Sequence, residues 1–179
     1  MMQIWMRLAG AACMVAGSSG LGFWLSGQYR ERLRELEQLR QMIFLLKGQI
    51  LYANATLEEG LEAVGRRTRG ALAGLFLQAA DRIAQQEGEP FCQIWKEAVG
   101  QLEQAGAGHA LSRSDLAALA ALGEHLGFLD RDMQERTLLL YLEQLDLQIQ
   151  ALREHRQERC RLYSSLGIMG GLFLTILLI

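Results

Sequence analysis

The stretch LEQLRQMIFLLKGQI, residues 36–50, decides the fold of this chain. Its apolar side chains recur at alternating spacings of three and four residues, at Leu36, Leu39, Ile43, Leu46 and Ile50. On a helix this spacing forms one stripe, the seam of a coiled-coil-like contact. A second seam with similar spacing lies near the other end of the chain, at Leu138, Leu142, Leu145, Ile149 and Leu152. The two seams predict two long helices that pack against each other.

Both seams are followed outward by uncharged, apolar segments, residues 8–29 and 162–179, with arginines at the inner edge of each. A helix that crosses a bilayer needs ~20 largely apolar residues. We therefore predict an N-terminal transmembrane helix (residues 1–29), a helical block (30–161) and a C-terminal transmembrane helix (162–179). The long helices, over 5–52 and 131–178, are expected to continue into the spans, which makes the two seams antiparallel.

Other interpretations of the two ends remain open. The C-terminal segment could be a buried core helix. The N-terminal segment has the features of a cleaved signal peptide: Arg7, an apolar run at 8–15, and small residues at 16–18. The apolar run continues past that site, through residues 21–25, which favours an uncleaved anchor. A lipoprotein site at Cys13 is less favoured because only five residues separate it from Arg7.

The flanking charges predict an orientation. Nine basic residues lie on the inner side of the two spans: Arg30, Arg32, Arg34, Arg40, Lys47, Arg153, Arg156, Arg159 and Arg161. On the outer side there is Arg7. Because Lys and Arg are retained on the cytoplasmic side, we expect the block to be cytoplasmic and the protein to lie in the cell membrane.

Small residues recur four apart in both predicted spans, which lets helix backbones approach closely in lipid. The C-terminal set is Gly167, Gly171 and Thr175, and the N-terminal sets are Ala9, Cys13 and Gly17, and Ser18, Gly22 and Ser26. They predict helix packing within the membrane. The alternative is that glycine is simply frequent in transmembrane helices.

Four short helices are expected between the long ones. Thr56 with Glu59, and Ser112 with Asp115, have the spacing of helix N-caps. A third helix is expected over about 71–86, and Pro90 fits the first turn of a fourth. Residues 106–109 read as a loop, and Asp130 as the cap of the last helix. The chain is thus predicted to be all-α: a six-helix bundle flanked by N- and C-terminal transmembrane helices.

A basic cluster, Arg66, Arg67 and Arg69, closes the short helix that begins at Thr56. Cations suit a helix C-terminus, so a solvated helix end is one interpretation. Contact with lipid headgroups or with an acidic partner surface is the other.

The sequence offers no catalytic, cofactor-binding or metal-binding residues. Its three cysteines and three histidines lie far apart, and no phosphate-binding loop or nucleophile motif is present. Residues 30–161 hold all but one of the 18 Lys and Arg and all 20 Asp and Glu, a net charge of −3. This charge does not favour nucleic acid as a partner.

The chain resembles the stage III sporulation protein AB family of spore-forming bacteria. The likeness lies in RERLRELEQLRQMIFLLKGQILYANATLEEGLEAV (30–64), FCQIWKEAV (91–99), LGEHLGFLDRDMQERTLLLYLEQLDLQIQALREH (122–155) and YSSLGIMGGLFLTILLI (163–179). A proline is expected close to Thr56 in this family and is absent here. The block is also similar to the cytoplasmic domain of the platform proteins of type II secretion and type IV pilus machines, where an L-x-x-G-L-like helix recurs; here it is Leu57, Gly60 and Leu61.

The resemblance implies a scaffold in the membrane around the forespore, in a channel complex that docks a secretion-type ATPase and other channel proteins. Two further classes are weighed beside it. An unrelated membrane-tethered coiled-coil or signalling protein would not need a closed core of short helices. A membrane enzyme would need titratable groups that converge in a pocket.

Overall fold

The computed structural model describes residues 29–85, 88–104, 110–127 and 130–178, and for 155–178 it describes the backbone alone. Every regular element in these residues is an α-helix, as predicted. The first helix is described over residues 29–51. It is followed by α2 (Leu57–Arg67), α3 (Ala71–Ala84), α4 (Phe91–Gln104), α5 (Arg113–Leu126) and α6 (Arg131–Leu178).

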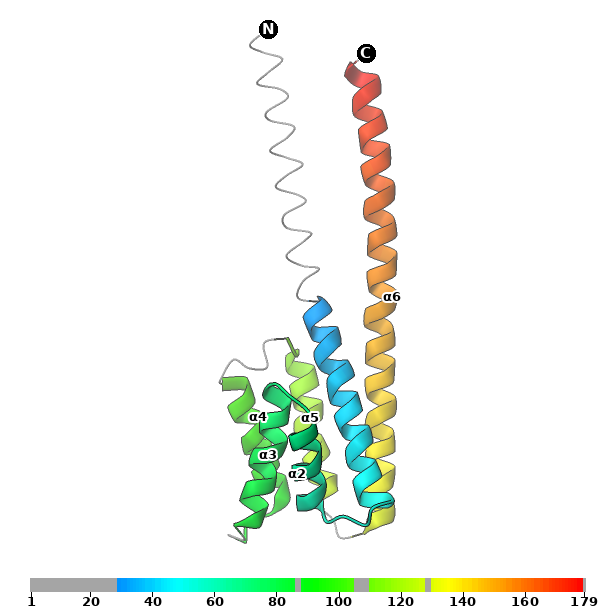
Figure 1. Cartoon of the computed structure of the whole chain (residues 1–179). Coiled ribbons are helices and arrows are strands. Elements are labelled where there is room, and N and C mark those ends of the chain that lie inside the picture. The colour runs from blue at the N-terminus through cyan, green and yellow to red at the C-terminus, as the bar shows by residue number, and fades with distance from the viewer. Residues whose placement is uncertain (1–28, 86–87, 105–109, 128–129, 179) are drawn as a thin grey trace.

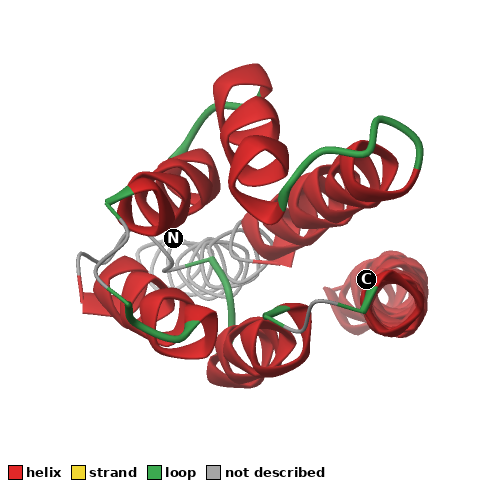
Figure 2. Cartoon of the chain, turned by 90° about the horizontal axis from the view of Figure 1, so that it is seen from below, coloured by secondary structure: helices red, strands yellow, loops and turns green. Residues whose placement is uncertain are grey.

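The helices run up and down in turn, so that neighbours in sequence are neighbours in space (Figure 1). Seen along their axes in Figure 2, they stand side by side in a ring. The first helix starts, and α6 leaves the bundle, at the same end. We call this the entry end: residues 29–35, 66–70, 101–104 and 110–116. The opposite end is the far end: residues 50–59, 82–91 and 126–134, described apart from 86–87 and 128–129.

The predicted caps are confirmed. The Glu59 amide donates to the Thr56 hydroxyl at 3.2 Å, and the Thr56 amide donates to the Glu59 carboxylate at 2.9 Å. Ser112 and Asp115 form the same reciprocal pair at the start of α5. At the start of α6 the Asp132 amide donates to the Asp130 carboxylate at 3.2 Å. These bonds satisfy amides that a helix leaves open at its N-terminus.

Most other boundaries also follow local chemistry. After the first helix, Asn54 adopts a left-handed φ of 55°, a conformation that stops helices. Gly70, with φ 92°, turns the chain between α2 and α3. The structure corrects three boundaries: the first helix ends at residue 51, one residue early, α3 ends at Ala84, two residues early, and Pro90 lies just before α4 instead of in its first turn. The predicted loop at 106–109 lies outside the described residues.

The core is one cluster to which all six helices contribute. Its largest side chains are Trp95 and Phe76, packed edge to face with ring centroids 5.4 Å apart. The indole of Trp95 donates to the Leu119 carbonyl at 2.7 Å, so its polar atom is satisfied inside the core. Both predicted seams are buried in this cluster, except that Leu152 is partly exposed.

The first helix and α6 are antiparallel neighbours, as predicted (Figure 1). Arg153 donates to Glu37 at 2.6 Å, and Arg40 forms a two-pronged ion pair with Asp146. Arg131, at the start of α6, bonds to Asn54, just beyond the end of the first helix. Going up the sequence from residue 37 to residue 54, the partner residues on α6 go down in number, from 153 to 131. The two helices are therefore antiparallel.

In the part of the chain that the structure describes, no helix is both long enough and apolar enough to span a bilayer. The predicted N-terminal span, residues 1–29, lies outside the described residues apart from Tyr29. Of the predicted C-terminal span, residues 162–178 have a described helical backbone within α6, and their side chains lie outside the description.

Candidate functional site

The predicted basic cluster lies at the entry end, where α2 ends. Arg67 and Arg69 are exposed, and Arg66 forms an ion pair with Glu62 one turn earlier at 2.6 Å. The loop itself is held in place, because the Arg69 carbonyl accepts a hydrogen bond from the Gln38 side chain at 2.6 Å. The cluster therefore sits in a defined position beside the first helix.

The up-and-down order brings further arginines to the same end. Arg113 is exposed at the start of α5, and Arg30 and Arg34 are exposed at the start of the first helix. The entry end holds seven arginines and four carboxylates: Arg30, Arg32, Arg34, Arg66, Arg67, Arg69 and Arg113 with Glu31, Glu35, Glu103 and Asp115. Sequence reasoning missed Arg113, because its place follows from the direction of α5.

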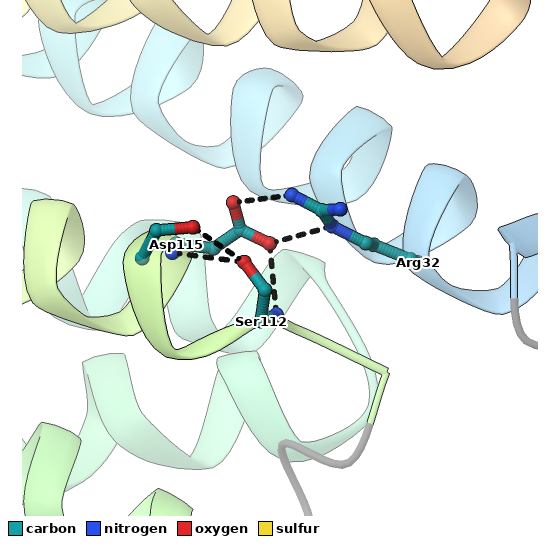
Figure 3. A network of polar contacts seen from close by, with 4 residues as sticks. Arg32, Ser112 and Asp115 are labelled. Carbon is teal, nitrogen blue, oxygen red and sulfur yellow. Dashed lines mark hydrogen bonds and ion pairs between the residues drawn. The ribbon is translucent and has the colours of Figure 1, made fainter. Parts of the chain in front are cut away.

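One polar network joins the first helix to α5 across the bundle (Figure 3). The Arg32 guanidinium donates to both oxygens of Asp115, at 2.8 and 3.0 Å. Asp115 also accepts from the Ser112 amide at 2.9 Å, so one carboxylate caps α5 and holds the first helix. Its side chain is 1% exposed.

This network keeps Asp115 ionised. Burial alone would raise the pKa of the carboxyl, but the hydrogen bonds from Arg32 and Ser112 and the positive charge of Arg32 outweigh burial and hold the pKa below its ordinary value. The sequence identified Asp115 as a cap but gave no sign of the ion pair, since Arg32 lies 83 residues away.

The far end carries a groove of about 520 Å³ with an apolar floor. The floor is formed by Ile50, Leu57, Ile83, Phe91, Ile94 and Leu126, and the rim includes Thr56, Arg82, Glu89 and Arg131. Arg82 is tied to Glu89 and Glu97 by ion pairs. The described residues of this end hold five carboxylates and two arginines: Glu58, Glu59, Glu89, Asp130 and Asp132 with Arg82 and Arg131. The two ends of the bundle thus have opposite charge.

The outer face of α6 is a third surface. Met133, Leu140 and Leu147 are 48%, 67% and 63% exposed and recur every seven residues. Residues at this spacing form one stripe along a helix. It lies opposite the buried stripe that contains Leu138 and Leu145. The spacing of these three residues is visible in the sequence, on the side of the helix away from the buried seam.

No arrangement suited to chemistry is found in the described residues. They contain no group of three or more His, Cys, Asp or Glu that could hold a metal ion. Cys92 is a free thiol, partly buried on α4. Of the predicted membrane-packing residues, Gly167, Gly171 and Thr175 lie on the described backbone of α6, whereas Ala9, Cys13 and Gly17 lie outside the described residues.

Comparisons with known proteins agree with one another. A family model described as stage III sporulation protein AB matches residues 7–179. The stage III sporulation protein AB of Bacillus subtilis (strain 168) is 25% identical over 173 residues, which are 97% of this chain and 99% of that protein. A solved structure of a stage III sporulation protein AB has a TM-score of 0.60 and 22% identity, and the match covers 72% of this chain and 98% of that one. At that identity the structural match supports the fold.

Proposed function

The chain belongs to the stage III sporulation protein AB family, and from that premise we propose that it is a membrane-anchored helical platform in a sporulation channel complex. It would hold a cytoplasmic ATPase and other channel proteins at the membrane around the forespore. Family membership supports a role in sporulation. The anchoring and docking roles are proposed from the sequence of the two ends and from the surfaces of the bundle.

One observation carries the proposal: the antiparallel pairing of the first helix and α6. The pairs Glu37–Arg153 and Arg40–Asp146 show that these two helices lie side by side, and the buried seams pack them into the same core. Their outward continuations, toward residue 1 and toward residue 179, therefore leave the bundle at the same end. Both continuations are the uncharged segments that we predict to be transmembrane helices. Two anchors in one bilayer would fix the tilt and rotation of the bundle.

The phase of α6 supports packing between the two spans. Its backbone is helical from Arg131 to Leu178. Gly167 follows Arg153 by two heptads and Asp146 by three, so it lies on the side of the helix that faces the first helix. Gly171 lies one turn further along the same side. We therefore propose that this small-residue stripe meets the N-terminal span.

Two surfaces are available for partners. The far end is distant from the proposed membrane, acidic, and hollowed by an apolar groove, which suits a basic protein segment that inserts an apolar side chain. The exposed stripe of α6 suits a partner helix. We propose that the ATPase docks at the far end and that other channel proteins pack along α6.

The test is complementation in a spore-forming strain that lacks its own copy. Three forms are compared by spore counts: the full chain, residues 1–161 and residues 30–161. We expect the full chain to restore sporulation and residues 30–161 to fail, although both contain the whole bundle. Full restoration by residues 30–161 would refute the platform role and favour a soluble adaptor.

A further inference from the structure

The entry end exposes guanidinium groups that have no partner among the described side chains. Within the described residues, no ion pair or side-chain hydrogen bond engages Arg67, Arg69 or Arg113, all of which are exposed. They come from two separate connections, the α2–α3 turn and the start of α5. Arginines gathered at one end of a bundle without paired carboxylates raise the positive potential there, so such a surface is stabilised by an external anion.

These arginines lie close to the level at which the chain would enter a bilayer. Asp115 is held by Arg32, three residues after Tyr29, or ~5 Å along the helix axis. The Arg69 carbonyl is held by Gln38, ~14 Å along the same axis from Tyr29. Arginine side chains are long enough to reach the headgroup layer from such positions. Both contacts bind these connections to the first helix. The α2–α3 turn and the start of α5 therefore have fixed positions along the axis of that helix.

We propose that the entry end is a docking surface for anionic lipid headgroups, with Arg67, Arg69 and Arg113 as the contact residues. The proposal rests on the membrane anchoring described above. The phosphate of a headgroup matches the guanidinium fork in charge and shape. The opposite charge of the far end strengthens the orientation, because an anionic bilayer attracts the entry end and repels the far end.

The surface would fix the orientation of the anchored bundle relative to the membrane. Two helices fix where the bundle enters the bilayer, but arginines in the α2–α3 turn and at the start of α5 would hold the rest of the ring against it. The bundle would then stand upright, with the acidic far end and its apolar groove directed away from the membrane. In a bilayer of zwitterionic lipid this support would be absent.

Arginine-specific labelling tests this directly on the full chain. The protein is reconstituted in nanodiscs of phosphatidylcholine, with or without 30% phosphatidylglycerol, and is treated with p-hydroxyphenylglyoxal. Peptide mass spectrometry then gives the modification rate of each arginine. We expect Arg67, Arg69 and Arg113 to react about fivefold more slowly in anionic discs. The exposed Arg136 of α6, toward the far end, should not change, and 0.5 M salt should remove the difference.

Matched variants provide a second readout. The triple change R67Q/R69Q/R113Q is compared with K47Q/R131Q/R136Q, which removes the same charge elsewhere in the bundle. Phosphatidylglycerol retained by the purified full-length protein should fall in the first variant and stay at the wild-type level in the second. Equal labelling rates in both discs, or equal lipid loss in both variants, would overturn the inference. If the chain fails to enter nanodiscs, both the membrane anchoring and the lipid surface are overturned. If it enters but shows equal labelling rates, only the lipid surface is overturned.

Discussion

The two long helices have similar sequence patterns but different positions in the fold. The first helix is bonded or packed to α2, to the α2–α3 turn, to α5 and to α6, and its seam residues are at most 2% exposed. α6 buries one side and presents Met133, Leu140 and Leu147 on the other. A seam in a sequence therefore shows that a helix has a buried side. It does not show how many neighbours the helix has or what its outer side does.

Charge insertion should give the largest effect. Ile43 is fully buried in the first helix, and Ile43→Asp should cost on the order of 4–5 kcal/mol and unfold the bundle, since an unpaired charge is buried. On α6, Leu145→Asp should cost several kcal/mol, whereas Leu147→Asp should stay within about 0.5 kcal/mol. Urea unfolding of residues 30–161, followed by circular dichroism, measures all three. We expect this block to fold alone. Equal costs at Leu145 and Leu147 would show that the outer side of α6 is covered.

Glycine substitutions should have the next largest effects, because they test how closely the first helix packs against its neighbours. A Cβ at Gly60 of α2 would lie 3.0 Å from Leu46 and 3.6 Å from Gln49 of the first helix. Gly60→Leu should therefore push the two helices apart and cost about 2–3 kcal/mol. Gly48, on the first helix, has no atoms within 4 Å of a Cβ, so Gly48→Ala should stabilise by about 0.5–1 kcal/mol. The same unfolding experiment tests both, and stabilisation by Gly60→Leu would contradict the close packing.

The contribution of the ion pair between Arg32 of the first helix and Asp115 of α5 to stability should depend on pH. Asp115→Asn keeps the cap but loses the ion pair with Arg32, which should cost about 1–2 kcal/mol at pH 7. The pKa of Asp115 is lowered in the folded state, so its contribution is present above the ordinary value of 3.8 and is lost as pH falls through the folded pKa. The stability difference between wild type and variant should shrink in acid. A difference that is constant down to pH 2 would contradict the assignment.

The ion pairs between the first helix and α6 should matter least. Arg40 and Asp146 have side chains that are 44% and 51% exposed, and solvent screens such pairs. Arg40→Ala should lower stability by less than about 1 kcal/mol, and a double-mutant cycle with Asp146→Ala should give a small coupling energy. A coupling above about 2 kcal/mol would mean that these pairs hold the two helices together.

Local chemistry made much of the fold predictable. Thr56 and Ser112 cap their helices through contacts three residues away, so their role is visible in the sequence. The seam residues from Leu36 to Ile149 are buried because their spacing leaves one side of a helix apolar. The expected proline near Thr56 is absent, yet α2 starts at the predicted place because the capping box alone defines its start.

The candidate surfaces were harder to predict because they depend on distant residues. Arg67 and Arg113 lie at the same end of the bundle because of the alternating direction of α2 and α5, which no local pattern encodes. The groove at the far end is assembled from the ends of all six helices. Gly60 belongs to the L-x-x-G-L-like pattern that the sequence shows. The structure explains why a glycine stands there: the Leu46 side chain approaches so closely that a Cβ would crowd it.

The unbroken course of α6 makes it a lever. The helix has 48 residues, ~72 Å in length, and the single proline of the chain lies elsewhere, at Pro90. Proline is a common cause of a sharp kink in a helix, and the backbone of α6 is α-helical throughout its length. If such a rod tilts by about 10°, its ends shift by ~12 Å relative to each other. A small inclination at residue 178 would thus become a large sideways displacement of Arg131 and of the apolar groove that it lines.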